Sequence, residues 1–273
     1  LREMVSAAHE AGADAVKFQT YRAETISTPG SFFTMEDGSK VSQFDFFKAY
    51  ELSKDDHAAL DTHCKAVGIP WFSTPSHPDD VVLLERFDPI AYKTGSDDLT
   101  NLPFLRHLGE TGRPLVVSTG MCTLDEVAKS VQAIQETGND NIVLLHCVVS
   151  YPSRPEDANL NAMATLADAF GLPVGLSDHT TDGFTSLLAT ALGAVAIEKH
   201  FAMDYSLGLP DSQAALDSAG LRDMVAGVRL AARAMGNGEK RILPTEEKWR
   251  QASRKSLFSS RAIPAGKRIE AED

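Results

Sequence analysis

The chain has 273 residues, of which 43% are hydrophobic and 23% are charged, as in ordinary soluble globular proteins. Its formal net charge of −12 argues against binding to nucleic acid or to an anionic membrane surface. No segment approaches the run of roughly 18 apolar residues that a membrane-spanning helix requires. The three cysteines show no CxxC spacing and no disulfide framework, so a reducing, cytoplasmic location is expected.

The chain opens with a helical pattern over residues 1–12, in which charged residues exclude a signal peptide. Seven short apolar runs follow, each bounded by turn residues or by an amphipathic segment. Such near-continuous runs are typical of parallel strands that are buried on both faces. The expected strands are residues 15–20, 69–74, 89–95, 114–120, 142–148, 173–179 and 195–201.

Helical patterns lie between these runs, at residues 124–138, 184–194 and 221–236. Thr123 is expected to cap the first of these helices, with Glu126 completing a capping box and Gly138 as the C-cap. Alternating strands and helices predict a parallel sheet. Seven strands spaced in this way favour a (β/α)₈ TIM barrel, and an open seven-stranded sheet is the alternative.

Because a helix comes first, the first strand of the barrel is expected to lie upstream of residue 1, and the missing initiator Met also suggests a fragment. The barrel domain is predicted to cover residues 1–243. Residues 21–58 form a long connection after a barrel strand, which is typical of a functional loop. Residues 244–273 are expected to be a linker and the start of a second domain, in which residues 256–263 alternate like a strand.

Polar residues gather at the carboxyl ends of the expected strands, where barrel enzymes carry their active sites. Lys17 and Lys93 lie inside otherwise apolar strands, where a lysine is unfavourable unless an anion neutralises it. With the hydroxyl groups beside them, they could form a cradle for a phosphate or a carboxylate. Internal salt bridges explain the same pattern equally well.

His179 and His200 end consecutive strands, and neighbouring strands lie about 4.8 Å apart. Both imidazoles could therefore hold one Lewis-acidic metal ion, with Asp178 and Glu198 orienting them. The alternative is that they are hydrogen-bonded histidines or general bases. His146 is expected to be a core histidine. The histidines expected on the surface are His9, His57, His63, His77 and His107.

The motifs GADAVKFQT, FSTPSHPDDVVLLE, YKTGSDDLTNLPFLRHL, PLVVSTGM, LLHCVVSYPS, GLSDHT and AIEKHF resemble the N-acetylneuraminate (sialic acid) synthase family. That family includes the legionaminic and pseudaminic acid synthases and related spore-coat polysaccharide enzymes. The resemblance runs in order from residue 1 to about residue 243. The tail of the chain resembles the linker into the family's small antifreeze-like (SAF) domain.

The resemblance implies a transferase that condenses phosphoenolpyruvate with an open-chain N-acylated mannosamine-type sugar and releases phosphate. It implies that manganese or magnesium is held by His179 and His200, and that the full-length enzyme is a domain-swapped homodimer. Asp98, where the family has Glu, would be catalytic with Lys17 and Lys93. Phosphoenolpyruvate would be held by these two lysines with Thr74, Ser96, Ser118 and Ser177, and the sugar by Gln19, Tyr151 and Asp211.

Two departures from the family pattern concern the sugar. The GPDH motif reads LPDS at residues 209–212, and the Asn expected before Tyr151 is Val149 or Ser150. Competing functions are a 3-deoxy-ulosonate synthase or aldolase acting on a phosphorylated sugar, and a Schiff-base aldolase with Lys93 or Lys199 as nucleophile. A sugar-binding barrel without enzymatic activity is the remaining alternative.

Overall fold

The computed structural model describes residues 1–34, 38–203 and 211–273. Internal contacts divide the chain into two compact units, Leu1–Ala234 and Met235–Asp273. Each unit is described by itself. The boundary that the sequence predicts, at residue 243, lies nine residues inside the second unit, and the assignment of residues 244–273 to the start of a SAF domain stays a prediction.

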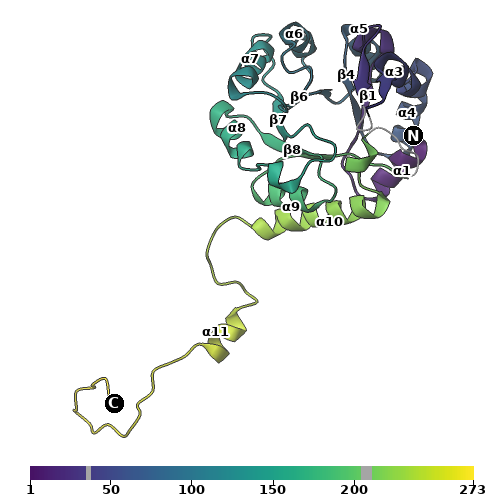
Figure 1. The fold of residues 1–273 in the computed structure, drawn as a ribbon. Helices are drawn as coiled ribbons and strands as arrows, with labels where there is room; N and C mark the ends of the chain where they lie inside the picture. Colours follow the sequence, from purple (N-terminus) through teal and green to yellow (C-terminus); the bar gives the residue numbers. More distant parts are fainter. Residues whose placement is uncertain (35–37, 204–210) are drawn as a thin grey trace. The chain divides into compact units, whose positions relative to one another are not determined.

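The first unit is built on one sheet of seven parallel strands in the order β1-β4-β5-β6-β7-β8-β9 (Figure 1). The strands are β1 (Val16–Thr20), β4 (Trp71–Pro75), β5 (Tyr92–Thr94), β6 (Leu115–Ser118), β7 (Ile142–Cys147), β8 (Val174–Asp178) and β9 (Ile197–Lys199). Sequence neighbours are spatial neighbours, as in a (β/α)₈ barrel. Within the described residues β1 and β9 are the two edges of the sheet, so the prediction of seven strands in barrel order is confirmed.

Helices surround this curled sheet (Figure 1). They are α1 (Arg2–Glu10), α4 (Lys54–Val67), α5 (Pro78–Leu84), α6 (Leu102–Glu110), α7 (Leu124–Gln135), α8 (Ala162–Phe170), α9 (Phe184–Ala191) and α10 (Ser218–Met235). The apolar core lies between the helices and the sheet, with fully buried residues such as Leu105, Leu115, Ile134 and Leu144. A parallel sheet needs this cover because its faces are too apolar for water.

Local sequence signals fix the helix ends. Thr123 caps α7, and its side chain and that of Glu126 form the predicted capping box. The C-cap of α7 is Glu136, so the prediction of Gly138 as the C-cap is wrong. Gly138 follows with a φ of 86°, a left-handed conformation that glycine adopts without strain.

The connection over residues 21–58 is not a plain loop. It contains the short helices α2 (Ala23–Ile26) and α3 (Gln43–Tyr50) and the antiparallel pair β2 (Phe32–Thr34) and β3 (Lys40–Ser42). Four aromatic rings pack against one another in this segment, with centroid distances between 5.3 and 5.8 Å. They belong to Tyr21, Phe33, Phe46 and Phe47. This aromatic cluster gives the segment a small core of its own.

The prediction that His57 lies on the surface is wrong, because this residue is fully buried. Its Nδ1 donates to the carbonyl of Ser53 at 2.8 Å, and its Nε2 lies 2.9 Å from the Thr20 hydroxyl. The ring also stacks on Phe87. The helical pattern of α4 does not reveal which face packs on β1, so this core histidine could not be found from its spacing. His146 has the hydrogen bond expected of it, to the carbonyl of Ala158 at 2.7 Å.

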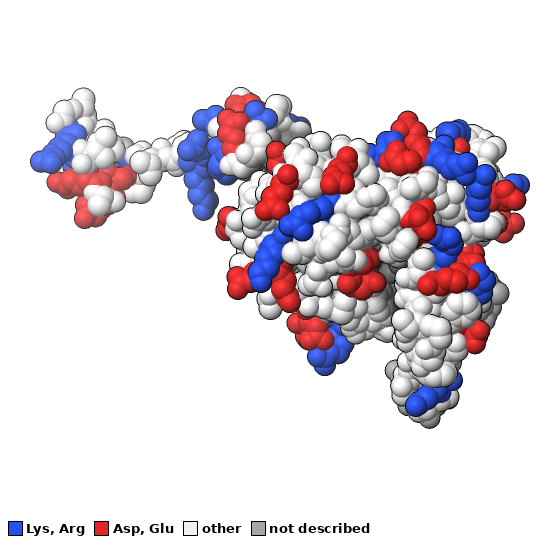
Figure 2. Space-filling model, turned by 90° about the horizontal axis from the view of Figure 1, so that it is seen from above, with Lys and Arg blue, Asp and Glu red and all other residues white. Residues whose placement is uncertain are grey.

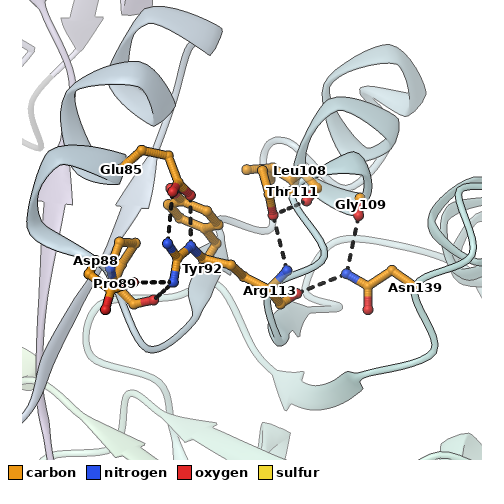
Figure 3. Close-up of polar contacts among 9 residues, drawn as sticks. All are labelled: Glu85, Asp88, Pro89, Tyr92, Leu108, Gly109, Thr111, Arg113 and Asn139. Carbon is orange, nitrogen blue, oxygen red and sulfur yellow. Dashed lines mark hydrogen bonds and ion pairs between the residues drawn. The ribbon is translucent and has the colours of Figure 1, made fainter.

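A polar network lies at the amino ends of β5 and β6, around Arg113 (Figure 3). The Arg113 guanidinium donates to both carboxylate oxygens of Glu85, at 2.7 and 2.8 Å, and to the carbonyl of Pro89. The hydroxyl of Tyr92 donates to Glu85 as well, at 2.7 Å. In barrel enzymes this end serves stability, whereas the carboxyl ends of the strands serve chemistry.

The second unit contains one helix, α11 (Glu247–Ser253). Residues 256–263, predicted as a strand, form no strand in the structure. Among the described residues, no helix combines the length and the apolarity that crossing a membrane would demand. Acidic and basic side chains are interspersed over the face that Figure 2 draws.

Candidate active site

A cavity of about 220 Å³ lies at the carboxyl ends of the strands. Its wall takes side chains from all seven strands of the sheet or from the loops that follow them. It brings together every predicted site residue except Asp98: Lys17, Gln19, Thr74, Lys93, Ser96, Ser118, Tyr151, Ser177, His179, His200 and Asp211.

A larger cavity of about 490 Å³ lies beside it and shares Asp97 with it. Asp98 lies on the wall of this second cavity and accepts a hydrogen bond from Asn101 at 3.2 Å. We assign the chemistry to the smaller cavity, because it alone of the two collects lysine ammonium groups. The catalytic role predicted for Asp98 has no geometric support here and stays a prediction.

Lys17 and Lys93 converge on one carboxylate, that of Glu198. The Lys17 Nζ lies 3.4 Å from Oε1 of Glu198, and the Lys93 Nζ lies 3.6 Å from Oε2. The three residues come from β1, β5 and β9. β9 lies at the opposite edge of the sheet from β1, so these contacts show that the curl of the sheet brings β9 close to β1 and β5 at this end. The internal salt bridges that the sequence allowed are therefore present, since Glu198 pairs with both ammonium groups. Both lysines also line the cavity, and their role as a cradle for a phosphate or a carboxylate stays a prediction.

Burial and mutual attraction both shift the pKa values in the cluster of Lys17, Lys93 and Glu198. Burial raises the pKa of Glu198, but the ammonium groups of Lys17 and Lys93 outweigh it and lower that pKa to about 2. Burial lowers the pKa of the Lys93 ammonium, which Glu198 partly opposes. Two ammonium groups against one carboxylate leave the cluster able to attract a further anion.

Hydroxyl groups surround the lysines. Thr74, Ser118 and Ser177 are buried at the carboxyl ends of β4, β6 and β8. The Ser96 hydroxyl lies after β5 and accepts a hydrogen bond from the backbone N–H of Gly120 at 3.1 Å. Its proton remains available to donate, either to the Cys147 sulfur, which it contacts, or to a molecule in the cavity. Ammonium and hydroxyl donors in one buried place suit the oxygens of a phosphate or a carboxylate.

The rings of His179 and His200 lie with their centroids 5.2 Å apart. The Nδ1 of His179 donates to the carbonyl of Val148 at 2.8 Å, which leaves Nε2 with a free lone pair. Burial and the charge of Lys17 lower the pKa of His200 to about 3, so this imidazole is neutral at neutral pH. Contacts with Cys147 and Val148 outweigh burial and raise the pKa of His179, whose proton a metal ion would displace.

This donor set fits a weakly held divalent ion. Metal-ligating histidines usually donate their second N–H to a carbonyl or a carboxylate, as His179 does to Val148. In the part of the chain that the structure describes, no cluster of three or more ligand-type side chains forms a metal site. Two imidazoles would thus leave most coordination positions open to substrate and water.

Tyr151 and Asp211 line the same cavity as His179 and His200. The Tyr151 ring lies 4.3 Å from the His179 ring and 5.7 Å from the His200 ring, between centroids. Burial raises the pKa of Asp211 above its ordinary value. Asp211 belongs to the LPDS motif, of which residues 209 and 210 lie outside the described residues. Both side chains could hydrogen-bond a polar molecule above the two histidine rings.

Sequence reasoning missed three titratable residues of the cavity wall: Asp97, Cys147 and Glu198, the last of which it assigned only to orienting a histidine. The Cys147 Sγ lies 3.9 Å from Nδ1 of His179. Glu198 could have been found as the one acidic residue among the strand ends that points to the same side as His200, two residues later. Asp97 follows from no pattern, because the conformation of its loop decides it.

The fold and this cavity define a class, that of barrel-like α/β proteins with a polar cavity at the carboxyl ends of the strands, in which two lysines lie near a candidate metal site. The model of the NeuB family matches residues 4–240, and the chain belongs to the NeuB family. It is 39% identical to the N,N'-diacetyllegionaminic acid synthase of Legionella pneumophila, over all of this chain and 79% of the relative. It is 35% identical to the pseudaminic acid synthase of Campylobacter jejuni, over 98% of this chain and 79% of the relative.

A solved structure agrees with these sequence relatives. The N-acetylneuraminic acid (sialic acid) synthetase of Leptospira borgpetersenii, in complex with citrate, superimposes with a TM-score of 0.82 at 27% identity, covering 93% of this chain and 87% of that one. The predicted resemblance and the prediction of a synthase of the transferase class are therefore confirmed. The relatives carry different sugar names, so they do not distinguish the product of this enzyme.

Proposed function

We propose that this enzyme condenses phosphoenolpyruvate with the open-chain form of an N-acylated amino sugar, giving a nonulosonic (sialic-type) acid and phosphate. The observation that carries the proposal is the convergence of Lys17 and Lys93 beside His179 and His200 in one cavity. The two lysines can hold an anionic donor, and the two histidines can hold an ion that activates an aldehyde. The named relatives are synthases of this type of product.

The cavity residues divide the work between binding and charge stabilisation. Lys17, Lys93 and the buried hydroxyls hold and orient phosphoenolpyruvate, which places its C3 toward the sugar aldehyde. A divalent ion, when bound to His179 and His200, supplies Lewis acidity to that aldehyde. A carbon–carbon bond forms between C3 and the aldehyde carbon, and positive charge develops at C2. The carboxylate of Glu198, ionised beside the lysines, stabilises that charge.

Water then adds to C2, and phosphate leaves with cleavage of the C2–O bond. The oxygen of the water becomes the ketone oxygen at C2, so both of its protons are lost. One protonates the alkoxide formed from the aldehyde oxygen, and the other leaves with the phosphate, which keeps the bridging oxygen. Lys17 and Lys93 offset the negative charge of the departing phosphate. No covalent link to the protein is needed, which separates this function from a Schiff-base aldolase. Lys199, one candidate nucleophile for that chemistry, does not line the cavity.

We propose manganese or magnesium as the ion, and either a mannosamine derivative or a diacetamido sugar as the acceptor. The 39% identity to a legionaminic acid synthase supports the diacetamido sugar. We also propose a cytoplasmic homodimer. Residues 235–273 support the dimer, since Trp249, Leu257 and Phe258 are exposed apolar side chains that a partner subunit could cover. Sedimentation analysis tests this assembly.

Lys93→Met tests the assignment of the cavity. We expect the KM for phosphoenolpyruvate to rise about tenfold or more, because a hydrogen bond to a charged group contributes about 1.5–3 kcal/mol. Lys65→Met is the control, since Lys65 is an exposed residue of α4 that pairs with Asp61. Steady-state kinetics of phosphate release measure both variants. Unchanged kinetics of Lys93→Met would remove this lysine from the substrate site.

Borohydride trapping with pyruvate tests the alternative. Lys93 is buried with a lowered pKa, which is the property of a Schiff-base lysine. The proposed condensation predicts no covalent labelling of the protein. Labelling that disappears in Lys93→Met would establish the aldolase instead.

A further inference from the structure

Asp178 and Lys199 form a buried ion pair on neighbouring strands. They are direct partners in the register of β8 and β9, and the Lys199 Nζ lies 3.3 Å from Oδ2 of Asp178. Each side chain is only 1% exposed. Neither residue lines the cavity, although the residues before and after each of them do. Because side chains alternate along a strand, the pair lies on the face of the sheet that turns away from the cavity.

The pair is the centre of a saturated network. Oδ1 of Asp178 accepts hydrogen bonds from the backbone N–H and the hydroxyl of Thr180, at 2.9 and 2.7 Å. Oδ2 accepts one from the hydroxyl of Ser186 on α9, at 2.6 Å. The Lys199 ammonium also donates to the carbonyl of Thr180. The network therefore ties together the ends of β8 and β9, the loop after β8 and the start of α9.

Stability alone is a poor explanation for this pair. Burying two charges is so unfavourable that well-packed apolar residues often stabilise a protein as much or more. The position of the pair suggests another role. Residues 178 and 180, on both sides of His179, belong to the network, and Lys199 directly precedes His200. β9 is a three-residue strand at the edge of the sheet, and its register against β8 rests on few contacts, which are backbone hydrogen bonds such as those from Val195 and Leu176 and this pair.

We propose that the Asp178–Lys199 pair is a positioning device for the two histidines. It holds the ends of β8 and β9 in register, so that the rings of His179 and His200 lie side by side in the cavity wall, with their centroids 5.2 Å apart. Asp178 and Lys199 are positioning residues, since they touch neither substrate nor metal. The inference rests on the proposed function, in which the two rings hold a divalent ion.

Two variants and one control test the role. Lys199→Met breaks the pair, and the double variant Asp178→Leu, Lys199→Met replaces it by apolar side chains. Arg113→Met is the control, because it breaks an ion pair with Glu85 at the opposite end of the strands. Electron paramagnetic resonance of free Mn²⁺ measures metal affinity, and thermal unfolding of the metal-free protein measures stability.

We expect the Mn²⁺ affinity to fall by about tenfold to a hundredfold in Lys199→Met and in the double variant, as for other residues that orient metal ligands. The double variant should lose metal affinity even where its melting temperature recovers. Arg113→Met should lower the melting temperature and leave the Mn²⁺ affinity unchanged. Should Lys199→Met fail to fold, the double variant takes its place in every measurement.

Wild-type Mn²⁺ affinity in the double variant would overturn the inference, as would an equal loss of affinity in Arg113→Met. If the wild-type protein binds no Mn²⁺, the metal site of the proposed function fails by itself. Crystal structures of the metal-free wild-type and double-variant proteins then decide. Displaced or turned rings of His179 and His200 in the variant support the inference, and an unchanged separation overturns it.

Discussion

Charged residues within apolar strands were the feature of the sequence that best indicated the functional site. Lys17 and Lys93 could be predicted as site residues because a lysine within an apolar strand requires a compensating anion. That anion is Glu198 within the protein. Glu198 could not be assigned this role from the sequence, because the contact depends on how far the sheet curls to bring β9 opposite β5. The choice between Asp97 and Asp98 depends on the shape of a loop in the same way.

Asp97 reaches the cavity only because residue 95 is a glycine. A Cβ at Gly95 would overlap Oδ1 of Asp97, so Gly95→Ala should displace this carboxylate. The displaced atom ends a flexible side chain, and the fold should tolerate the change. We expect Gly95→Ala and Asp97→Ala to raise the KM for the acceptor sugar alike, by up to about tenfold, as the loss of one hydrogen bond predicts. Steady-state kinetics measure this, and a rise in Asp97→Ala alone would contradict the account.

The elements that could be predicted are those with a long local signal. The seven strands follow from continuous apolar runs, and α7 follows from its capping box. The elements within residues 21–58 could not be predicted, because they are three to eight residues long and are held by aromatic contacts between segments. The strand expected at residues 256–263 alternates correctly but has no partner strand among residues 235–273.

Gly175 shows how closely two strands approach. A Cβ at Gly175 in β8 would overlap the backbone carbonyl oxygen of Ala196, just before β9. Gly175→Ala should therefore destabilise the protein by about 1–3 kcal/mol, as other overpacking substitutions do. Gly220→Ala is the control, because its Cβ would meet nothing closer than 3.3 Å. Urea unfolding compares the two variants. If the two variants have the same free energy of unfolding, β9 can shift without loss of stability. That result would contradict the rigid ends of β8 and β9 that the site requires.

At the scale of the whole molecule, the two ends of the strands have separate tasks. The network around Arg113 (Figure 3) lies at the amino ends. The cavity lies at the carboxyl ends. The order of the strands could be predicted because consecutive strands of such folds are neighbours. The separation of tasks follows from the same topology, since every loop that follows a strand meets the others at one end.

The network gives stability a defined pH dependence. The hydrogen bond from Arg113 lowers the pKa of Glu85 below its ordinary value. A lowered folded-state pKa contributes stability above the unfolded pKa of about 4.3, and this contribution is lost as the pH falls through the folded pKa. Glu85→Gln should therefore be less stable than the wild type at neutral pH and about equally stable near pH 3. Urea unfolding at both pH values measures the difference, and a constant difference would exclude the carboxylate as its source.

The central claim is that one cavity joins phosphoenolpyruvate to an N-acylated amino sugar. The most direct measurement incubates the purified protein, Mn²⁺ and phosphoenolpyruvate labelled with ¹⁸O at the bridging oxygen with N-acetylmannosamine or with a diacetamido sugar. Mass spectrometry follows both products. The account predicts phosphate that retains the label, formed in equal amount with a sugar acid enlarged by three carbons, and no product after chelation of the metal. Release of unlabelled phosphate, or consumption of phosphoenolpyruvate without a condensed product, would contradict it.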